Sequence, residues 1–112
     1  MLPACGFDSV ERQWASRESL PSCGSVRLVE EALQVAGKEG VACLDRALES
    51  GRGAVLAVRF STVEGDPIAE YYRVLPDGSA EVYVDSTKDE FGEQRWSHSR
   101  CEKPEPALDV NC

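Results

Sequence analysis

Residues 54–85 read AVLAVRFSTVEGDPIAEYYRVLPDGSAEVYVD, and this stretch decides the fold. Its β-branched and aromatic residues concentrate in three runs, separated by the turn sequences EGDP at 64–67 and PDGS at 76–79. Such runs indicate strands, and Pro, Asp and Gly between them indicate tight turns. We therefore predict strands over 54–62, 68–75 and 80–85, paired as an antiparallel meander.

The segments that follow extend this sheet. Residues 95–101 predict a fourth strand, and 108–112 predict a short edge strand. Because side chains alternate between the two faces of a strand, one set of apolar residues should lie on a face that a helix covers. This set comprises Leu56, Val58, Phe60, Ile68, Tyr72, Val74, Val82 and Val84.

One amphipathic helix is predicted over 38–50. Val41, Leu44 and Leu48 recur at i, i+3 and i+7, and Gly51 follows where a helix-ending glycine belongs. The fold class is therefore α+β, with one helix on one face of an antiparallel meander of four to five strands. We assign 23–112 to this single domain and 1–22 to an N-terminal tether.

Length and charge exclude several classes of protein. A chain of 112 residues is the size of one domain, and 12 basic against 20 acidic residues give a net charge of -8. Nucleic acid is therefore not an expected partner, nor is an anionic membrane surface. No apolar stretch approaches the roughly 20 residues of a transmembrane helix. We expect a monomer without a cofactor.

Five cysteines indicate disulfides, because the chain has no CxxC motif and only one histidine, His98. Disulfides imply an extracytoplasmic location. Without Cys5, three pairings remain among four cysteines, and spacing alone does not rank them. The proline-containing segment 103–106 could return the chain beside the fourth strand. This favours Cys101–Cys112, which leaves Cys23–Cys43.

Cys5 has a separate interpretation. The sequence LPAC at 2–5 resembles the end of a bacterial lipoprotein signal, in which the cysteine is cleaved free and lipidated. An ordinary disulfide and an unpaired thiol remain alternatives for Cys5. Residues 6–22 show no clean period and predict a linker or a short helix, with Trp14 as its anchor if the segment is ordered.

Two acidic loops carry the candidate ligand- or cation-binding residues Glu64, Asp66, Asp85 and Asp89. In the predicted meander, both loops lie at the same end of the sheet. Asp85, Asp89 and Glu90 are calcium candidates, although their spacing differs from that of an EF-hand. The structural alternative is that the carboxylates accept hydrogen bonds from loop amides, and we favour it.

The same loops resemble a known family. The sequences TVEGDPI at 62–68 and DSTKDEFG at 85–92 are similar to the patterns T-x-E-G-D-P-I and D-x-x-x-D-x-F-G of an uncharacterised family of secreted and lipid-anchored proteins of Gram-positive bacteria. That family has no established function. The resemblance implies that Cys101 and Cys112 are its late cysteine pair, whereas Cys23 and Cys43 look like an addition in part of the family.

Enzyme chemistry is poorly supported. His98 would have to serve a Ser-His-Asp site, but Ser97 and Ser99 should point to the opposite strand face, and no G-x-S-x-G motif exists. A carboxylate pair could be drawn from Glu64, Asp66 and Asp85, as in any acidic protein. We therefore predict a non-enzymatic module that binds an extracytoplasmic protein or small ligand. A small disulfide-rich protease inhibitor is the first alternative, and a carboxylate-based hydrolase the second.

Overall fold

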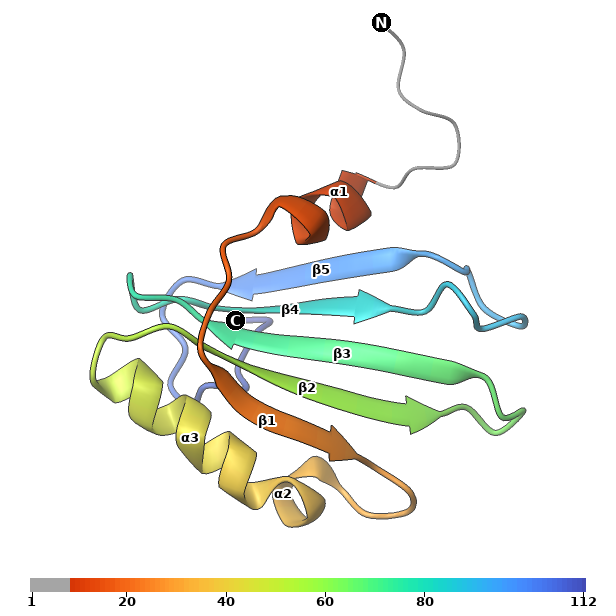
Figure 1. Ribbon diagram of the computed structural model, residues 1–112, viewed down its shortest axis with the longest axis horizontal. Coiled ribbons are helices and arrows are strands. Elements are labelled where there is room, and N and C mark those ends of the chain that lie inside the picture. Colours follow the sequence, from red (N-terminus) through yellow and green to blue (C-terminus); the bar gives the residue numbers. More distant parts are fainter. Residues whose placement is uncertain (1–8) are drawn as a thin grey trace, which may run out of the picture.

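The computed structural model describes residues 9–112, which form a five-stranded sheet with helices (Figure 1). The strands follow one another across the sheet in chain order, β1-β2-β3-β4-β5. The elements are α1 (Ser9–Ser16), β1 (Ser22–Arg27), α2 (Leu33–Ala36), α3 (Lys38–Glu49), β2 (Ala54–Ser61), β3 (Pro67–Val74), β4 (Ala80–Asp85) and β5 (Trp96–Cys101). The predicted α+β class is correct.

The prediction of a purely antiparallel meander is wrong at one edge. Strands β2 to β5 pair antiparallel as expected, but β1 pairs parallel to β2, with Val26 opposite Val58. Parallel neighbours need a crossover, and α2 with α3 provides it. The sequence SCGSVR gave no strand signal because Val26 is its only β-branched residue and Gly24 interrupts it.

Helix α3 covers one face of the sheet and forms the core there. Leu44 on α3 and Leu56 and Val58 on β2 have no exposed surface. Leu56 lies opposite Tyr72, and Phe60 lies opposite Ile68, so the predicted inward-facing set does share one face. The buried cluster consists of Leu44, Ala47, Ala54, Leu56, Val58, Val74, Ala80, Val82, Ala107 and Val110.

The C-terminal segment completes this core without forming the predicted edge strand at 108–112. Ala107 and Val110 are buried in the core cluster. The backbone is held by other means than a strand ladder. The Ala107 amide donates to Asp45 Oδ1 on α3 at 2.9 Å, and Cys112 is bonded to Cys101.

Both predicted disulfides are present. Cys23 on β1 is bonded to Cys43 on α3, with Cα atoms 5.7 Å apart, and Cys101 is bonded to Cys112, with Cα atoms 5.1 Å apart. In the chain-entropy model, loops of this length contribute about 3 kcal/mol each to stability. The first bridge fastens the parallel edge strand to the helix that packs beside it.

Helix α1 lies against the face of the sheet opposite α3. Of the two predictions for the N-terminal segment, a linker or a short helix, the structure shows the helix. None of its residues is fully buried, but Trp14 stacks on Tyr71 of β3 with ring centroids 4.3 Å apart. Trp14 is thus the anchor that the sequence suggested. Cys5, the predicted lipidation site, lies outside the described residues. No helix within 9–112 is long and apolar enough to cross a membrane.

Candidate functional site

Three connections gather at one end of the sheet: 28–32 after β1, the turn 62–66 after β2, and 86–95 after β4 (Figure 1). The topology causes this grouping. Strands β1 and β2 are parallel, and β4 runs in the same direction as β2 because both are antiparallel to β3. All three strands therefore end at the same edge. We call these three connections the loop end.

The two acidic loops singled out in the sequence touch each other here. Asp66 Oδ2 accepts a hydrogen bond from the Glu90 amide at 3.0 Å, which joins the turn to the longer loop. Asp85 Oδ1 accepts from the Thr87 amide at 3.0 Å, and Asp89 Oδ1 accepts from the Phe91 amide at 3.2 Å. The hydrogen bonds favoured by the structural alternative are therefore present, and they shape both loops.

Glu64 differs from the other three candidates because its side chain is exposed at the tip of the turn. The expectation that the two loops share one end of the sheet is confirmed for Asp66, Asp85 and Asp89 by these contacts. A role of the four carboxylates in contacting a ligand stays a prediction.

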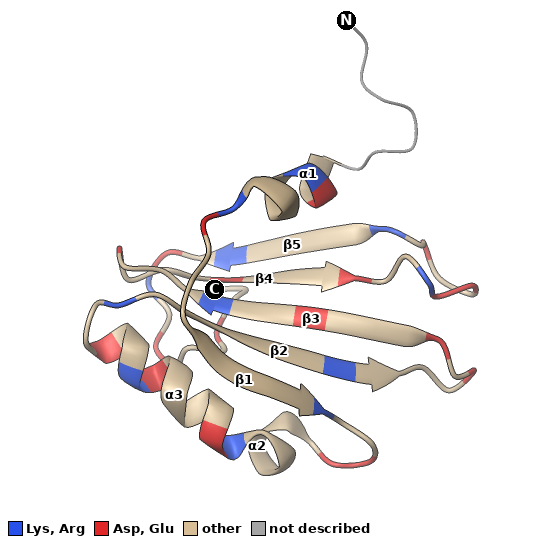
Figure 2. Ribbon diagram, in the orientation of Figure 1, with Lys and Arg blue, Asp and Glu red and all other residues tan. Residues whose placement is uncertain are grey.

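Each connection of the loop end exposes one large apolar side chain. Val29 is 83% exposed, Val63 is 99% exposed and Phe91 is 76% exposed. Single exposed apolar residues are common, but one on each of three adjacent loops is typical of a contact surface. The same connections contain seven acidic residues against two basic ones, and Figure 2 shows acidic positions on all three. The sequence indicated the carboxylates of the loop end, but it did not indicate that Val29, Val63 and Phe91 are exposed there.

In the described part of the chain, no cluster of carboxylates is suited to binding calcium. There, one trio of metal-binding side chains gathers within 4.8 Å, formed by Cys101, Asp109 and Cys112. The two sulfurs of this trio are bonded to each other, so they offer no thiolate. The calcium role of Asp85, Asp89 and Glu90 stays a hypothesis.

His98 lies in a structural network on the face of the sheet opposite α3. Its Nε2 is 2.8 Å from Glu81 Oε1, and the other carboxylate oxygen of Glu81 pairs with Arg73. Glu81 and Arg73 are both buried, which makes their mutual pairing necessary. Ser97 and Ser99 occupy the alternate positions of β5, facing the other side as predicted. His98 therefore contacts a buried carboxylate.

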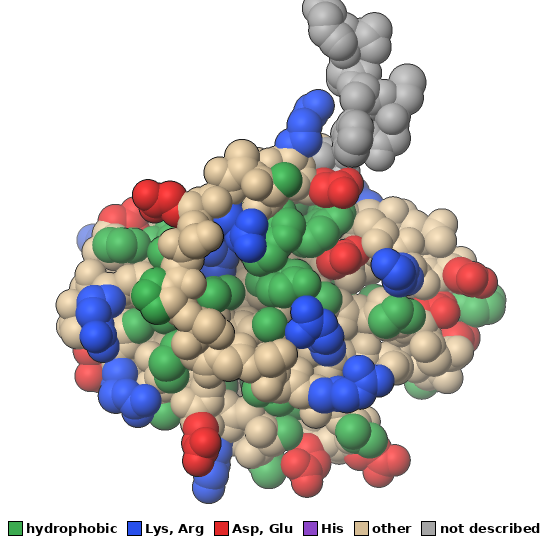
Figure 3. Space-filling view, in the orientation of Figure 1, with side chains coloured by type: hydrophobic (Ala, Val, Ile, Leu, Met, Phe, Trp, Pro, Cys, Tyr) green, Lys and Arg blue, Asp and Glu red, His purple; other side chains and the backbone are tan. Residues whose placement is uncertain are grey.

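The same face carries an aromatic cluster that sequence reasoning did not identify. Trp14 lies 5.2 Å from Tyr83 and 5.7 Å from Trp96 between ring centroids, in addition to its stack on Tyr71. Figure 3 shows hydrophobic side chains gathered on this face with basic side chains around them. The sequence does contain a signal for this cluster, which is the alternation of side chains along a strand. Tyr71, Tyr83 and Trp96 alternate along their strands with residues that face α3.

Comparison of the chain with models of protein families, with curated proteins and with solved structures found no match.

Proposed function

We propose that this protein is an extracytoplasmic, non-enzymatic binding module whose loop end docks on a basic surface of another protein. One observation carries the proposal: Val29, Val63 and Phe91 stand exposed on three adjacent loops that are otherwise acidic. Burying such side chains in a partner removes apolar area from water. The acidic residues around them would select a partner of positive charge.

Phe91 is the expected anchor of this contact. Aromatic residues often dominate binding energy when they enter a pocket on the partner. The loop that carries Phe91 is held by the hydrogen bond from Glu90 to Asp66 and by the turn at Asp85. A loop that is already ordered loses less conformational entropy on binding, which favours affinity.

The proposed compartment follows from the cysteines. Two disulfides in a domain of this size are compatible with an oxidising environment. We propose that the protein is secreted or is held at the outer face of a cell membrane through a lipid on Cys5. Membership of the secreted and lipid-anchored family, suggested by the motifs at 62–68 and 85–92, is part of the same proposal.

The alternative functions have less support. A disulfide-rich inhibitor usually presents a binding loop braced by its bridges, but neither Cys23–Cys43 nor Cys101–Cys112 lies in the three connections of the loop end. For a hydrolase, a carboxylate pair must be free to act on substrate. Asp66 and Asp85 instead accept hydrogen bonds that shape their loops.

A binding assay with a defined probe tests the proposal. We expect a synthetic peptide that alternates lysine with leucine to bind the purified protein, and the same peptide with glutamate in place of lysine not to bind. The double variant V63S/F91S should weaken binding by at least about thirtyfold, the scale of an interface hot spot. V35S changes an exposed valine outside the three connections and is the matched control.

Equal binding by V63S/F91S and V35S would refute the docking surface. Binding of the glutamate peptide as strongly as the lysine peptide would refute the charge selection. Raising the salt concentration should weaken the lysine peptide, because exposed charges are screened.

A further inference from the structure

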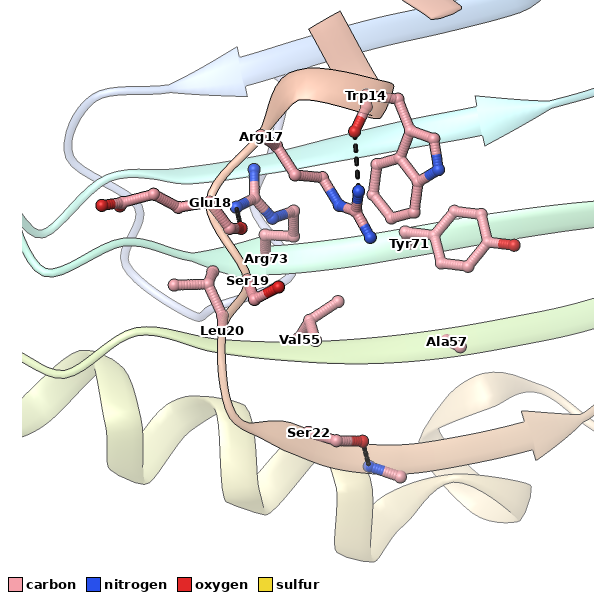
Figure 4. Close-up of a pocket in the computed structure, with 11 residues that line it drawn as sticks. Trp14, Arg17, Glu18, Ser19, Leu20, Ser22, Val55, Ala57, Tyr71 and Arg73 are labelled. Carbon is pink, nitrogen blue, oxygen red and sulfur yellow. Dashed lines mark hydrogen bonds between the residues drawn. The ribbon is translucent and has the colours of Figure 1, made fainter.

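A concave site lies on the other side of the molecule from α3, between the sheet and the segment that leads from α1 to β1. It is a pocket of about 220 Å³, and Figure 4 shows the residues around it. Its roof is Trp14 and Arg17, and its floor comes from β2 and β3. The residues that line it include Trp14, Arg17, Val55, Ala57, Tyr71 and Arg73.

Two guanidinium groups reach this pocket. Arg73 is buried and donates through Nη2 to the Glu18 carbonyl oxygen at 2.9 Å, while its Nη1 pairs with Glu81 below. Arg17 donates through Nη1 to the Trp14 carbonyl oxygen at 2.7 Å, and its Cζ lies 3.5 Å from the centre of the Trp14 ring. Both arginines are thereby fixed in position, and each keeps further N–H groups for another acceptor.

Among the described residues, Arg17 has no carboxylate partner, whereas the charge of Arg73 is balanced by Glu81. Of the described residues that line the pocket, Glu18 alone is acidic, and Figure 4 shows its carboxylate pointing away from Trp14 and Tyr71. Partial burial and the neighbouring charge of Arg73 together lower the pKa of Arg17. An anion placed beside Arg17 would offset this effect.

The surroundings of the pocket extend this positive region. A neighbouring hollow of about 250 Å³ shares Tyr71, and its charged lining residues are Arg27, Arg59, Lys88 and Asp85. Arg59 lies over the Tyr71 ring, with its Cζ 5.9 Å from the ring centre. In a chain of net charge -8, this concentration of cations would guide an anion to one face. It adjoins the acidic loop end, to which Lys88 belongs.

We propose that the pocket binds a small organic anion, with its carboxylate or phosphate head between Arg17 and Arg73 and a short apolar tail on the floor. Val55 and Ala57 supply an apolar surface for that tail. Guanidinium groups bind carboxylate and phosphate with matching planar geometry, so the head group alone does not distinguish these two acids. The proposal is independent of protein docking at the loop end.

Tryptophan fluorescence is the direct test, because Trp14 forms part of the pocket and Trp96 lies beside it. The probes are hexanoate, hexyl phosphate and inorganic phosphate, each added to the purified protein. We expect hexanoate or hexyl phosphate to change the fluorescence saturably at millimolar concentrations or below. Inorganic phosphate, which has no tail, should bind more weakly than hexyl phosphate. No saturable change with either tailed probe would overturn the proposal.

Matched variants locate the site. R17Q should weaken binding of the tailed anion by about tenfold or more, as expected for the loss of a charged hydrogen-bonding partner. R12Q makes the same change on the exposed side of α1 and should leave binding unchanged. Equal affinity in R17Q and R12Q would overturn the assignment. R17K keeps the positive charge and should bind more tightly than R17Q, so equal weakening in both would also count against it.

A57L tests the floor of the pocket. The larger side chain should exclude the tail of hexyl phosphate and leave inorganic phosphate bound as in the wild type. Unchanged binding of hexyl phosphate by A57L would contradict the proposed position of the tail. Arg73 is unsuitable for this purpose, because its removal would leave Glu81 buried without its partner.

Discussion

Replacing Trp14 with alanine should release α1 from the sheet, because this side chain joins the helix to rings on β3, β4 and β5. Trp14 makes three ring contacts, with centroid distances of 4.3, 5.2 and 5.7 Å. Aromatic pairs contribute about 0.5–1.5 kcal/mol each beyond the area that they bury. The cation–π contact with Arg17 adds about 0.5–1 kcal/mol at an exposed site. We expect W14A to lower the free energy of unfolding by about 3 kcal/mol.

Two measurements check this value. Urea denaturation gives the change in the free energy of unfolding, and hydrogen exchange of the amides at 9–21 shows whether the helix has detached. Q13A, at the neighbouring exposed position of α1, is the control. The reasoning is refuted if W14A and Q13A are equally stable and the amides at 9–21 exchange at the same rate in both.

Two further predictions concern the interior. E81Q removes the carboxylate charge that pairs with Arg73 and should cost about 3 kcal/mol, as for other broken buried pairs. The exposed change E102Q should cost little in the same urea assay, and equal costs would contradict the network. Burial first, then the charge and hydrogen bond of Glu70, raise the pKa of Tyr72. Folding therefore favours the protonated phenol, so this contribution to stability is complete below the unfolded pKa of about 10 and is lost as the pH rises above it. Y72F should unfold with a weaker dependence on alkaline pH, and an unchanged dependence would contradict the assignment.

The sequence predicted those parts of the fold that local chemistry determines. The strands from Ala54 to Asp85 are predicted by their composition and by the turns at 64–67 and 76–79. Helix α3 is predicted by the period of its apolar residues. Strand β1 could not be found in this way. Its place depends on parallel pairing with β2 and on the bond from Cys23 to Cys43, both of which involve residues distant along the chain. The strand predicted over 108–112 is absent although Val110 is buried, because a buried apolar residue need not belong to a strand.

The candidate site was predictable to a similar degree. Meander topology was enough to place Asp66 and Asp85 at one end of the sheet, because it depends only on strand direction. The exposure of Val63 and Phe91 depends on how tightly their loops pack, and the sequence contains no direct signal for that. The pocket beneath Trp14 required the N-terminal segment to fold back across the sheet, which is a tertiary contact.

Photo-crosslinking in the cells that produce this protein is the most direct test of docking through the loop end. A photoreactive amino acid would replace Phe91 in one variant and Arg52, which lies at the opposite end of β2, in another. We predict that the group at 91 captures one extracytoplasmic protein, that its crosslinked peptide lies on a surface of positive charge, and that V63S reduces the yield. Capture of the same protein in equal yield from position 52, or no crosslink from position 91, would contradict the account.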